Sequence, residues 1–299
     1  MTTDAWKAAL DALLGGGDVR RGGTAVTAAD RARLEDALAA LPPGEPCEGP
    51  TVREVLAAPS RARVRDLFLG GKDHYAVDRL AAAELTAAWP DIARATAALR
   101  AAVHTTARHA VGGLGIRQVL VADYGYPTAG TSGRDLHTTV HQASPDAAVL
   151  YLEPDPIAAA ALRALCGHGS VAVLRDDPAA DPGGAFARAV RDGGLDLGRP
   201  VCVLLPEAMA RTGAPGRTAR VLARALAPGS VVMVMAAGPD DIPAVRRAAE
   251  AAARHLLPFH PRTAAGLRDL LGAAGLTCLE HGPLLARTGH ACAVGVRRA

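Results

Sequence analysis

The sequence lacks the patterns that mark several large classes of protein. Its cysteines are odd in number and form no Cys-x-x-Cys pair, which argues against a disulfide framework and a zinc cluster. They are Cys47, Cys166, Cys202, Cys278 and Cys292. No apolar run approaches the roughly 20 residues of a membrane span, and the amphipathic, acid-containing N-terminus does not resemble a secretory signal. We therefore expect a cytoplasmic protein that contacts no membrane.

The net charge is small, and aromatic side chains are scarce. The formal net charge is only +3, and the arginines are scattered among Asp and Glu, so no basic face suited to nucleic acid stands out. We expect no nucleic-acid partner. Aromatic residues make up 3% of the chain, whereas 49% of its 299 residues are hydrophobic. This is enough to fill the core of one large α/β domain, or of such a domain with a helical appendage.

The first 115 residues show no convincing strand. Segments rich in Ala, Leu and Arg, with helical periodicity, alternate with breaks rich in Gly and Pro. The predicted helices cover 3–14, 28–40, 51–57, 60–68, 76–88 and 91–111. The Pro-rich stretch 41–50 is typical of a linker. The predicted division is an N-terminal helical arm and linker (1–50), a helical lid region (51–115) and a Rossmann-like domain (116–299).

After Gly115, short apolar runs alternate with Ala-rich helical segments, which indicates parallel βαβ units buried on both faces. The runs cover 117–123, 148–153, 171–176, 200–206 and 230–237. Two further strand-like segments, 276–282 and 290–298, are joined by a loop too short for a crossover helix and should form an antiparallel hairpin. The predicted fold is therefore α/β, a doubly wound sheet with the strand order of a class I methyltransferase (Rossmann-like) domain. A dinucleotide-binding domain would continue with another parallel unit.

Candidate ligand residues follow the first four strands, because ligands of such sheets bind beyond the carboxyl ends of the strands. They are Asp123, Tyr124, Gly125, Pro127, Thr128, Glu153, Pro154, Asp155, Asp176, Asp177, Pro206 and Glu207. Glu153 suits a ribose diol, since a carboxylate accepts two hydrogen bonds. Asp155, followed by Pro156, equally suits the cap of the next helix. Asp176 or Asp177 could hold an adenine amino group or form a solvated turn.

Metal and nucleophile motifs are missing from the sequence. His137 and His141 share one helix face, but no H-E-x-x-H pattern or third ligand accompanies them, so no metal site is expected. The chain has no G-x-S-x-G elbow and no Walker loop, which disfavours hydrolase and NTPase activities.

Three stretches carry a resemblance to a known family. The segment PSRARVRDLFLGGKDHYAVDR (59–79) matches the opening P-x-x-A-R-x-Y-D-Y-L-L-G-G-K-D-N-F-x-x-D-R. GIRQVLVADYGYPT (115–128) is similar to G-x-R-Q-F-L-D-I-G-T-G-L-P-T, and PDAAVLYLEPDP (145–156) is similar to P-x-A-R-V-V-Y-V-D-N-D-P. These patterns belong to an actinobacterial S-adenosylmethionine-dependent methyltransferase family, long catalogued as a domain of unknown function. The resemblance covers about the middle two thirds of the chain.

The resemblance implies S-adenosylmethionine as cofactor and a lid made by the N-terminal helices. Gly70, Gly71, Lys72 and Asp73 would line the cleft, where a Gly-Gly turn permits close backbone approach and Lys72 could pair with a carboxylate. A helix-ending turn would equally explain the glycines. The expected ribose acid is Glu153.

The sequence also departs from the family patterns. The usual acid of the first motif falls on Val121 and its first glycine on Asp123, which could contact the cofactor's ammonium or block the space that glycine leaves. After the fourth strand, the stretch PEAMART (206–212) replaces an apolar run that leads to a His-Phe pair. The Asn-Phe of the opening becomes His74 and Tyr75.

Methyl transfer to a small-molecule substrate is the favoured function, with His74, His137 or Glu207 as candidate catalytic residues. One alternative is a non-catalytic descendant that senses a ligand or binds a partner protein. Another is an enzyme of the same fold with different chemistry. A nucleotide-sugar or NAD(P) enzyme is disfavoured by the C-terminal hairpin. The sequence does not determine the oligomeric state, so a homodimer stays open.

Overall fold

The computed structural model describes residues 57–127, 135–166, 169–238, 242–257, 259–279 and 290–298. They all belong to the compact unit Glu54–Ala299. The predicted helices at 3–14 and 28–40, and nearly all of the one at 51–57, lie outside the described residues. The predicted division of the chain into an arm, a lid region and a Rossmann-like domain stays a prediction.

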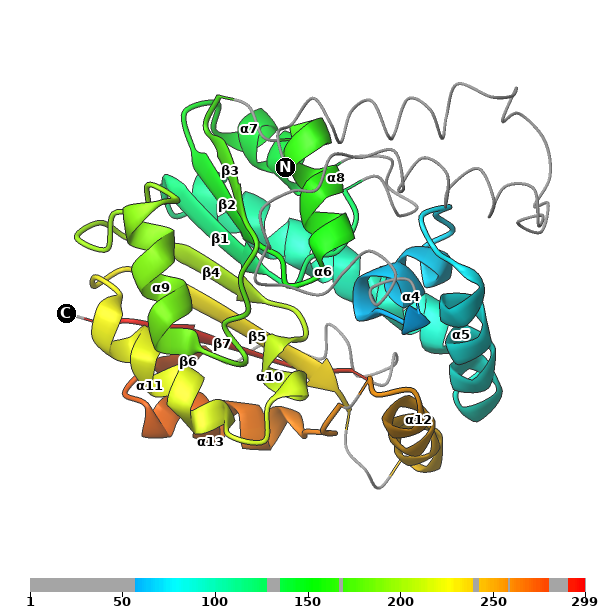
Figure 1. Cartoon of the computed structure of the whole chain (residues 1–299). Helices are drawn as coiled ribbons and strands as arrows, with labels where there is room; N and C mark the ends of the chain where they lie inside the picture. Colours follow the sequence, from blue (N-terminus) through cyan, green and yellow to red (C-terminus); the bar gives the residue numbers. More distant parts are fainter. Residues whose placement is uncertain are drawn as a thin grey trace. The chain divides into compact units, whose positions relative to one another are not determined.

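Seven strands form one sheet in the order β3-β2-β1-β4-β5-β7-β6 (Figure 1). They are β1 (Gln118–Ala122), β2 (Ala148–Leu152), β3 (Val171–Leu174), β4 (Cys202–Leu205), β5 (Val231–Ala237), β6 (Thr277–Leu279) and β7 (His290–Val296). The first five are parallel, and β7 pairs antiparallel with both β5 and β6. The predicted α/β fold with five parallel strands and a C-terminal antiparallel pair is therefore confirmed. The strand order switches between β1 and β4.

The described part of the chain contains ten helices. They are α4 (Arg61–Phe68), α5 (Ala76–Ala88), α6 (Ile92–Gly112), α7 (Leu136–Ala143), α8 (Pro156–Cys166), α9 (Pro182–Arg191), α10 (Ala208–Arg211), α11 (Pro215–Ala225), α12 (Pro243–Arg254) and α13 (Ala264–Ala273). The predicted helices at 60–68, 76–88 and 91–111 are confirmed as α4, α5 and α6. None of the described helices is both long and apolar enough to cross a membrane.

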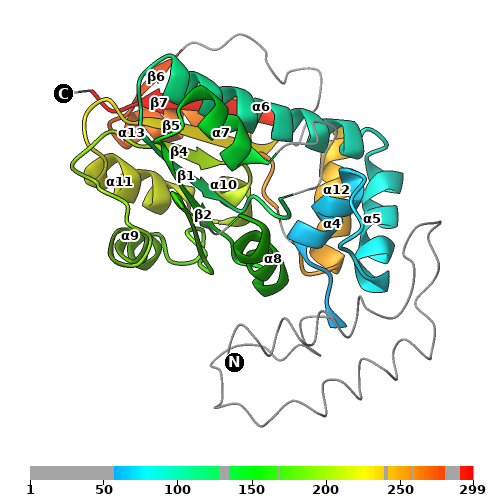
Figure 2. The same cartoon turned by 90° about the horizontal axis from the view of Figure 1, so that it is seen from above.

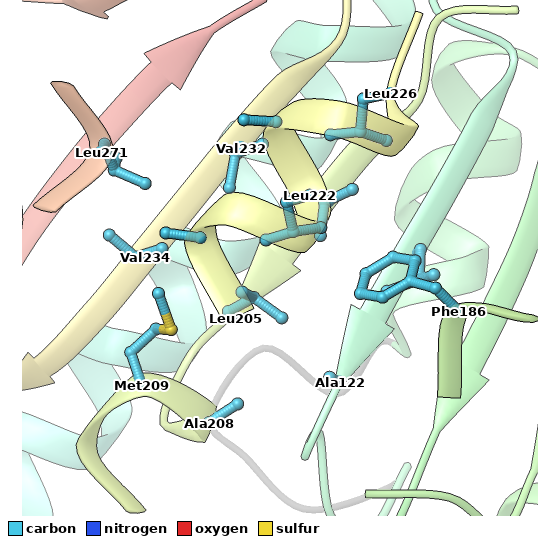
Figure 3. Packing of buried hydrophobic residues seen from close by; sticks show 14 of the residues in the cluster. Ala122, Phe186, Leu205, Ala208, Met209, Leu222, Leu226, Val232, Val234 and Leu271 are labelled. Carbon is cyan, nitrogen blue, oxygen red and sulfur yellow. The ribbon is translucent and has the colours of Figure 1, made fainter. Parts of the chain in front are cut away.

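Both faces of the sheet are buried, which explains the continuous apolar runs. Alternate residues of β1 point to opposite faces, so Val119 and Val121 join the core under α6, α7 and α8. Leu120 and Ala122 join the core under α9, α11 and α13. Figure 3 shows this second core, where Phe186 and Met209 pack among the aliphatic side chains. Each large side chain buried there contributes roughly 1.5–3 kcal/mol.

A helical cap of α4, α5 and α12 lies beyond the strand ends (Figure 2). Its core includes Trp89 and Ile92, which pack against the small apolar face of α12. Asp78 is fully buried and accepts hydrogen bonds from the backbone N–H groups of Ser60 (2.9 Å) and Tyr75 (2.8 Å). Arg63 lies 3.3 Å from the same carboxylate. These contacts fix α4 against α5 and thereby position the arginines that α4 directs at the sheet.

Candidate functional site

The loop after β1 is held by arginines. Asp123 has a φ of +58°, in the left-handed region that costs a non-glycine residue roughly 1–2 kcal/mol. Its Oδ1 accepts a hydrogen bond from Arg65 (3.1 Å) and its Oδ2 from Nε of Arg211 (2.8 Å). Arg65 also donates to the backbone carbonyl of Asp123. The two side chains therefore stabilise a conformation that Asp123 would not adopt readily by itself.

Asp123 is a permanent negative charge in this loop. Burial by itself would raise its pKa, but Arg211, Arg65 and Arg61 outweigh the burial and lower the pKa to about 2. The side chain is only 1% exposed. The sequence left two roles open for Asp123, contact with the cofactor's ammonium or obstruction of the space that glycine leaves. In the structure its carboxylate instead binds Arg65 and Arg211 of the chain itself.

Glu153 fastens the loop after β1 to the end of β2. Its side chain is fully buried, and its Oε2 and Oε1 accept hydrogen bonds from the backbone N–H groups of Gly125 (2.7 Å) and Asp155 (3.1 Å). Burial and the neighbouring Asp123 raise the pKa of Glu153 to about 8. Asp155 caps α8, because its Oδ1 accepts from the N–H groups of Ile157 (2.9 Å) and Ala158 (2.8 Å).

The two acids after β3 have different partners. Asp176 is bound by Arg188 of α9, at 2.5 and 2.8 Å. Asp177 is bound by the terminal nitrogens of Arg211, at 2.5 and 2.9 Å. Of these two acids, Asp177 is therefore the one linked to Asp123, because Arg211 binds both at the carboxyl edge of the sheet.

Glu207 extends these contacts to the end of β4. Its Oε2 lies 3.2 Å from Arg65 and 3.8 Å from Arg61. We call the chain of ion pairs Asp177, Arg211, Asp123, Arg65 and Glu207 the edge network. Sequence reasoning named its three acids and missed its two arginines. Spacing was an available signal for Arg65 alone, because Arg65 lies four residues after Arg61 and shares its face of α4.

A pocket of about 70 Å³ adjoins the edge network at the end of β4. We call it the β4 pocket; it is lined by Arg61, Val64, Arg65, Phe68, Leu85, Trp89, Ile92, Thr96, Glu207, Ala210, Ala252, Leu257 and Phe259. The chain has only three Phe and two Trp residues, and three of these five line this pocket. Aromatic walls with a few converging charged groups are typical of a small-molecule site. The pocket is smaller than the roughly 300–1,000 Å³ of such sites, so an acceptor requires its walls to move apart.

A larger cavity, of about 350 Å³, lies between α6 and α7. Arg100 at its wall donates to the carbonyl groups of Tyr124 (2.9 Å) and Tyr126 (3.3 Å), and stacks 3.8 Å from the centroid of the Tyr124 ring. His104 bonds the hydroxyl groups of Thr139 (2.8 Å) and Tyr124 (2.9 Å). Burial, together with Arg100 and Arg108, lowers the pKa of His104 to about 4. These contacts hold the first loop from its other side.

The Gly-Gly turn after α4 serves the packing of that helix. A Cβ on Gly71 would lie 1.9 Å from the carboxylate of Asp66, and Gly70 has a φ of +78°. The turn also closes α4, since the N–H of Gly71 donates to the carbonyl of Asp66 (2.8 Å). Asp66 in turn accepts from the N–H of Asp73 (2.7 Å), and burial raises the pKa of Asp66 to about 6. Lys72 is exposed, and no carboxylate of the described residues forms an ion pair with it.

The two candidate histidines lie apart from Glu207. His74 is in the turn before α5, 3.5 Å from Arg79. His137 is the second residue of α7, where its N–H donates to the hydroxyl of Tyr151 (3.1 Å). Neither histidine lines the β4 pocket. Pro127 and Pro206 are buried at the strand ends and Pro154 is half-buried, whereas Thr128 lies outside the described residues.

His137 also belongs to a group that offers three metal-ligating atoms. The ligand atoms of Asp135, His137 and Cys166 lie within 4.8 Å of one another. Burial and the nearby Asp135 raise the pKa of the Cys166 thiol to about 12, which disfavours the thiolate that a metal would require. The expectation of no metal site stays a prediction.

Comparison with known proteins adds a family and a fold. A family model described as S-adenosyl methyltransferase matches residues 54–288. A putative methyltransferase from Thermobifida fusca is 23% identical, covering 81% of this chain and 96% of that chain with a TM-score of 0.72. A DUF574 family protein from Streptomyces avermitilis is 24% identical, covering 82% of this chain and 99% of that chain with a TM-score of 0.66. The two structures share the fold of this chain. No curated protein sequence matches it.

Proposed function

Because the chain belongs to the S-adenosyl methyltransferase family, whose cofactor is S-adenosylmethionine, we propose that it methylates a small-molecule acceptor in the β4 pocket. When bound, S-adenosylmethionine supplies a methyl group on a positively charged sulfonium leaving group. The task left to the chain is then mainly to position the acceptor and to exclude water.

The acidic side chains at the carboxyl edge of the sheet have the chemistry that this cofactor requires of its binding groups. Carboxylates after β1, β2 and β3 are suited to a ribose diol, an amino group or an ammonium group. In the structure, however, Asp123, Glu153 and Asp177 are already bonded to groups of the chain itself. The edge therefore fits the cofactor only after some of these contacts open.

The β4 pocket is the observation that carries the proposal. It shares Arg65 and Glu207 with the edge network, so an acceptor in the pocket would lie beside the cofactor edge. Its aromatic walls suit an apolar body. Arg61 and Arg65 suit an anionic or strongly polar substituent on that body.

Glu207 is the acid placed to take a proton from such an acceptor. Both arginines contact its Oε2, and no hydrogen bond within the described residues involves its Oε1. The cations keep Glu207 in place at the pocket wall, and a base must lie within hydrogen-bond reach of the proton that it removes. His74 and His137 stay predictions as catalytic residues, without a contact to this pocket.

Two measurements test this function. Calorimetry with S-adenosylmethionine and S-adenosylhomocysteine should detect binding, and release of S-adenosylhomocysteine should be stimulated by small aromatic acids. Glu207→Gln should lower kcat with little change in cofactor affinity. The matched control, Glu250→Gln on the exposed side of α12, should leave both unchanged. Failure of both ligands to bind at millimolar concentration would favour a non-catalytic descendant.

Assignment to the actinobacterial branch with the LLGGKDN-type motif is part of this proposal, and both similar structures come from Actinobacteria. The cytoplasmic location, the absence of nucleic-acid and membrane partners, and the question of a homodimer stay predictions.

A further inference from the structure

The guanidinium of Arg211 lies across the strand ends where the proposed function places the cofactor. Its Nε donates to Asp123 after β1, and its two terminal nitrogens donate to Asp177 after β3. Because β2 lies between β1 and β3 in the sheet, the guanidinium of Arg211 bridges the residues that follow the two strands on either side of β2. Glu153, which follows β2, is close enough to contribute with Asp123 and Asp177 to raising the pKa of Arg211.

In the observed state, every side-chain oxygen of Asp123, Glu153 and Asp177 already accepts a hydrogen bond from the chain itself. Asp123 bonds Arg65 through Oδ1 and Arg211 through Oδ2. Glu153 uses both oxygens for backbone N–H groups. Asp177 bonds Arg211 through both oxygens. A ribose diol or an adenine amino group would have to compete with the chain for the same acceptors.

Arg211 is the member of the edge network that can leave. Its side chain is 16% exposed and that of Asp177 is 28% exposed, whereas Arg65 and Asp123 are 6% and 2% exposed. Arg211 ends the single-turn helix α10, whose Met209 is anchored in the core (Figure 3). Its side chain can therefore swing outward while its backbone stays, and the buried Arg65–Asp123 pair remains to hold the loop.

We propose that Arg211 is a gate that keeps the cofactor edge closed until its guanidinium leaves Asp123 and Asp177. The inference rests on the proposed function, because it concerns the same ligand. A protein that spends most of its time closed binds with an apparent affinity reduced by the open fraction. Forked, charge-assisted hydrogen bonds to two carboxylates favour the closed state strongly. We therefore expect removal of the gate to tighten binding by a factor of about ten or more.

The test is calorimetry of the full chain with S-adenosylhomocysteine and, separately, S-adenosylmethionine. Arg211→Ala should bind both at least about tenfold more tightly than the wild type. The affinity of Arg211→Lys should lie between those of the wild type and Arg211→Ala, because an ammonium group cannot donate to both aspartates as a planar guanidinium does. Arg188→Ala is the matched control, since Arg188 forks onto Asp176, one residue before Asp177, at similar distances. That control should bind like the wild type.

The outcomes separate the gate from the proposed function. If the wild type binds as tightly as Arg211→Ala, or if Arg188→Ala tightens binding equally, the gate is refuted while cofactor binding stands. If none of the proteins binds either ligand, the proposed function falls and the gate falls with it. Thermal unfolding verifies that each variant is folded, and Arg211→Lys carries the comparison if Arg211→Ala does not fold.

Discussion

Replacing Asp123 by Asn tests whether the buried charge of the edge network stabilises the fold. Asn keeps the size of the side chain and tolerates a φ of +58°, so the substitution removes mainly the charge. The pKa of Asp123 is lowered from 3.8 to about 2 by its arginines, despite its burial. The lowered pKa corresponds to a stabilisation on the order of 2 kcal/mol at pH 7.

The sign of the pH dependence follows from the lowered pKa. The charge of Asp123 contributes its full stabilisation above pH 3.8, where the carboxyl is ionised even in the unfolded chain. The contribution is lost as the pH falls through about 2, and at pH 3 roughly half of it is left. The wild type and Asp123→Asn should therefore differ most at pH 7 and converge in acid.

Urea unfolding followed by tryptophan fluorescence measures this difference, since Trp89 is buried in the helical cap. Asp146→Asn is the control, because Asp146 is exposed on the turn before β2, and it should change the free energy of unfolding by less than about 0.5 kcal/mol. A loss below about 1 kcal/mol for Asp123→Asn at pH 7, or a loss that does not shrink toward pH 3, would refute the reasoning.

Three further predictions concern packing, capping and titration. Gly71→Ala should lower the free energy of unfolding by about 1–3 kcal/mol, because the added Cβ would overlap the Asp66 carboxylate. Denaturant titration measures the change, and an unchanged unfolding midpoint would contradict the prediction. Asp155→Ala should cost about 1 kcal/mol through loss of the α8 cap, whereas Asp155→Asn should retain most of it. Since His104 has a pKa lowered from 6.5 to about 4 by its burial and Arg100, stability should fall by up to about 3 kcal/mol as the pH drops between those values. His104→Gln should lose that pH dependence, and equal pH curves for both proteins would contradict the assignment.

The strand pattern allowed most of the sheet to be predicted. Continuous apolar runs such as 117–123 arise because parallel strands are buried on both faces, and every predicted run contains an observed strand. The C-terminal hairpin followed from the short connection between its strands. The packing of α12 against α5 could not be predicted, because the two helices are far apart in sequence and their Ala-rich faces specify no particular partner.

The candidate site was only partly legible in the sequence. The acids at the strand ends were found because the edge of a parallel sheet collects the residues that follow each strand. The arginines that bind them were missed, since each comes from a different element. Arg65 stands where the quoted family pattern has Tyr, and Asp123 stands where it has Gly. The departure at Asp123 was recognised from the sequence and the one at Arg65 was not, and only the fold shows that the two residues form one ion pair.

The sequence by itself determined the sheet, the three described helices that precede it (α4, α5 and α6) and the family. These features depend on local periodicity and on motifs whose residues are close together in the chain. Only the tertiary structure decided the state of the cofactor edge, because the pairing of Arg211 with Asp123 and Asp177 joins the ends of three different strands. Ion pairs depend on distance and burial, which no single stretch of sequence specifies. The loop after β1 was thus identified from its residues, and its closure by Arg211 came from the fold.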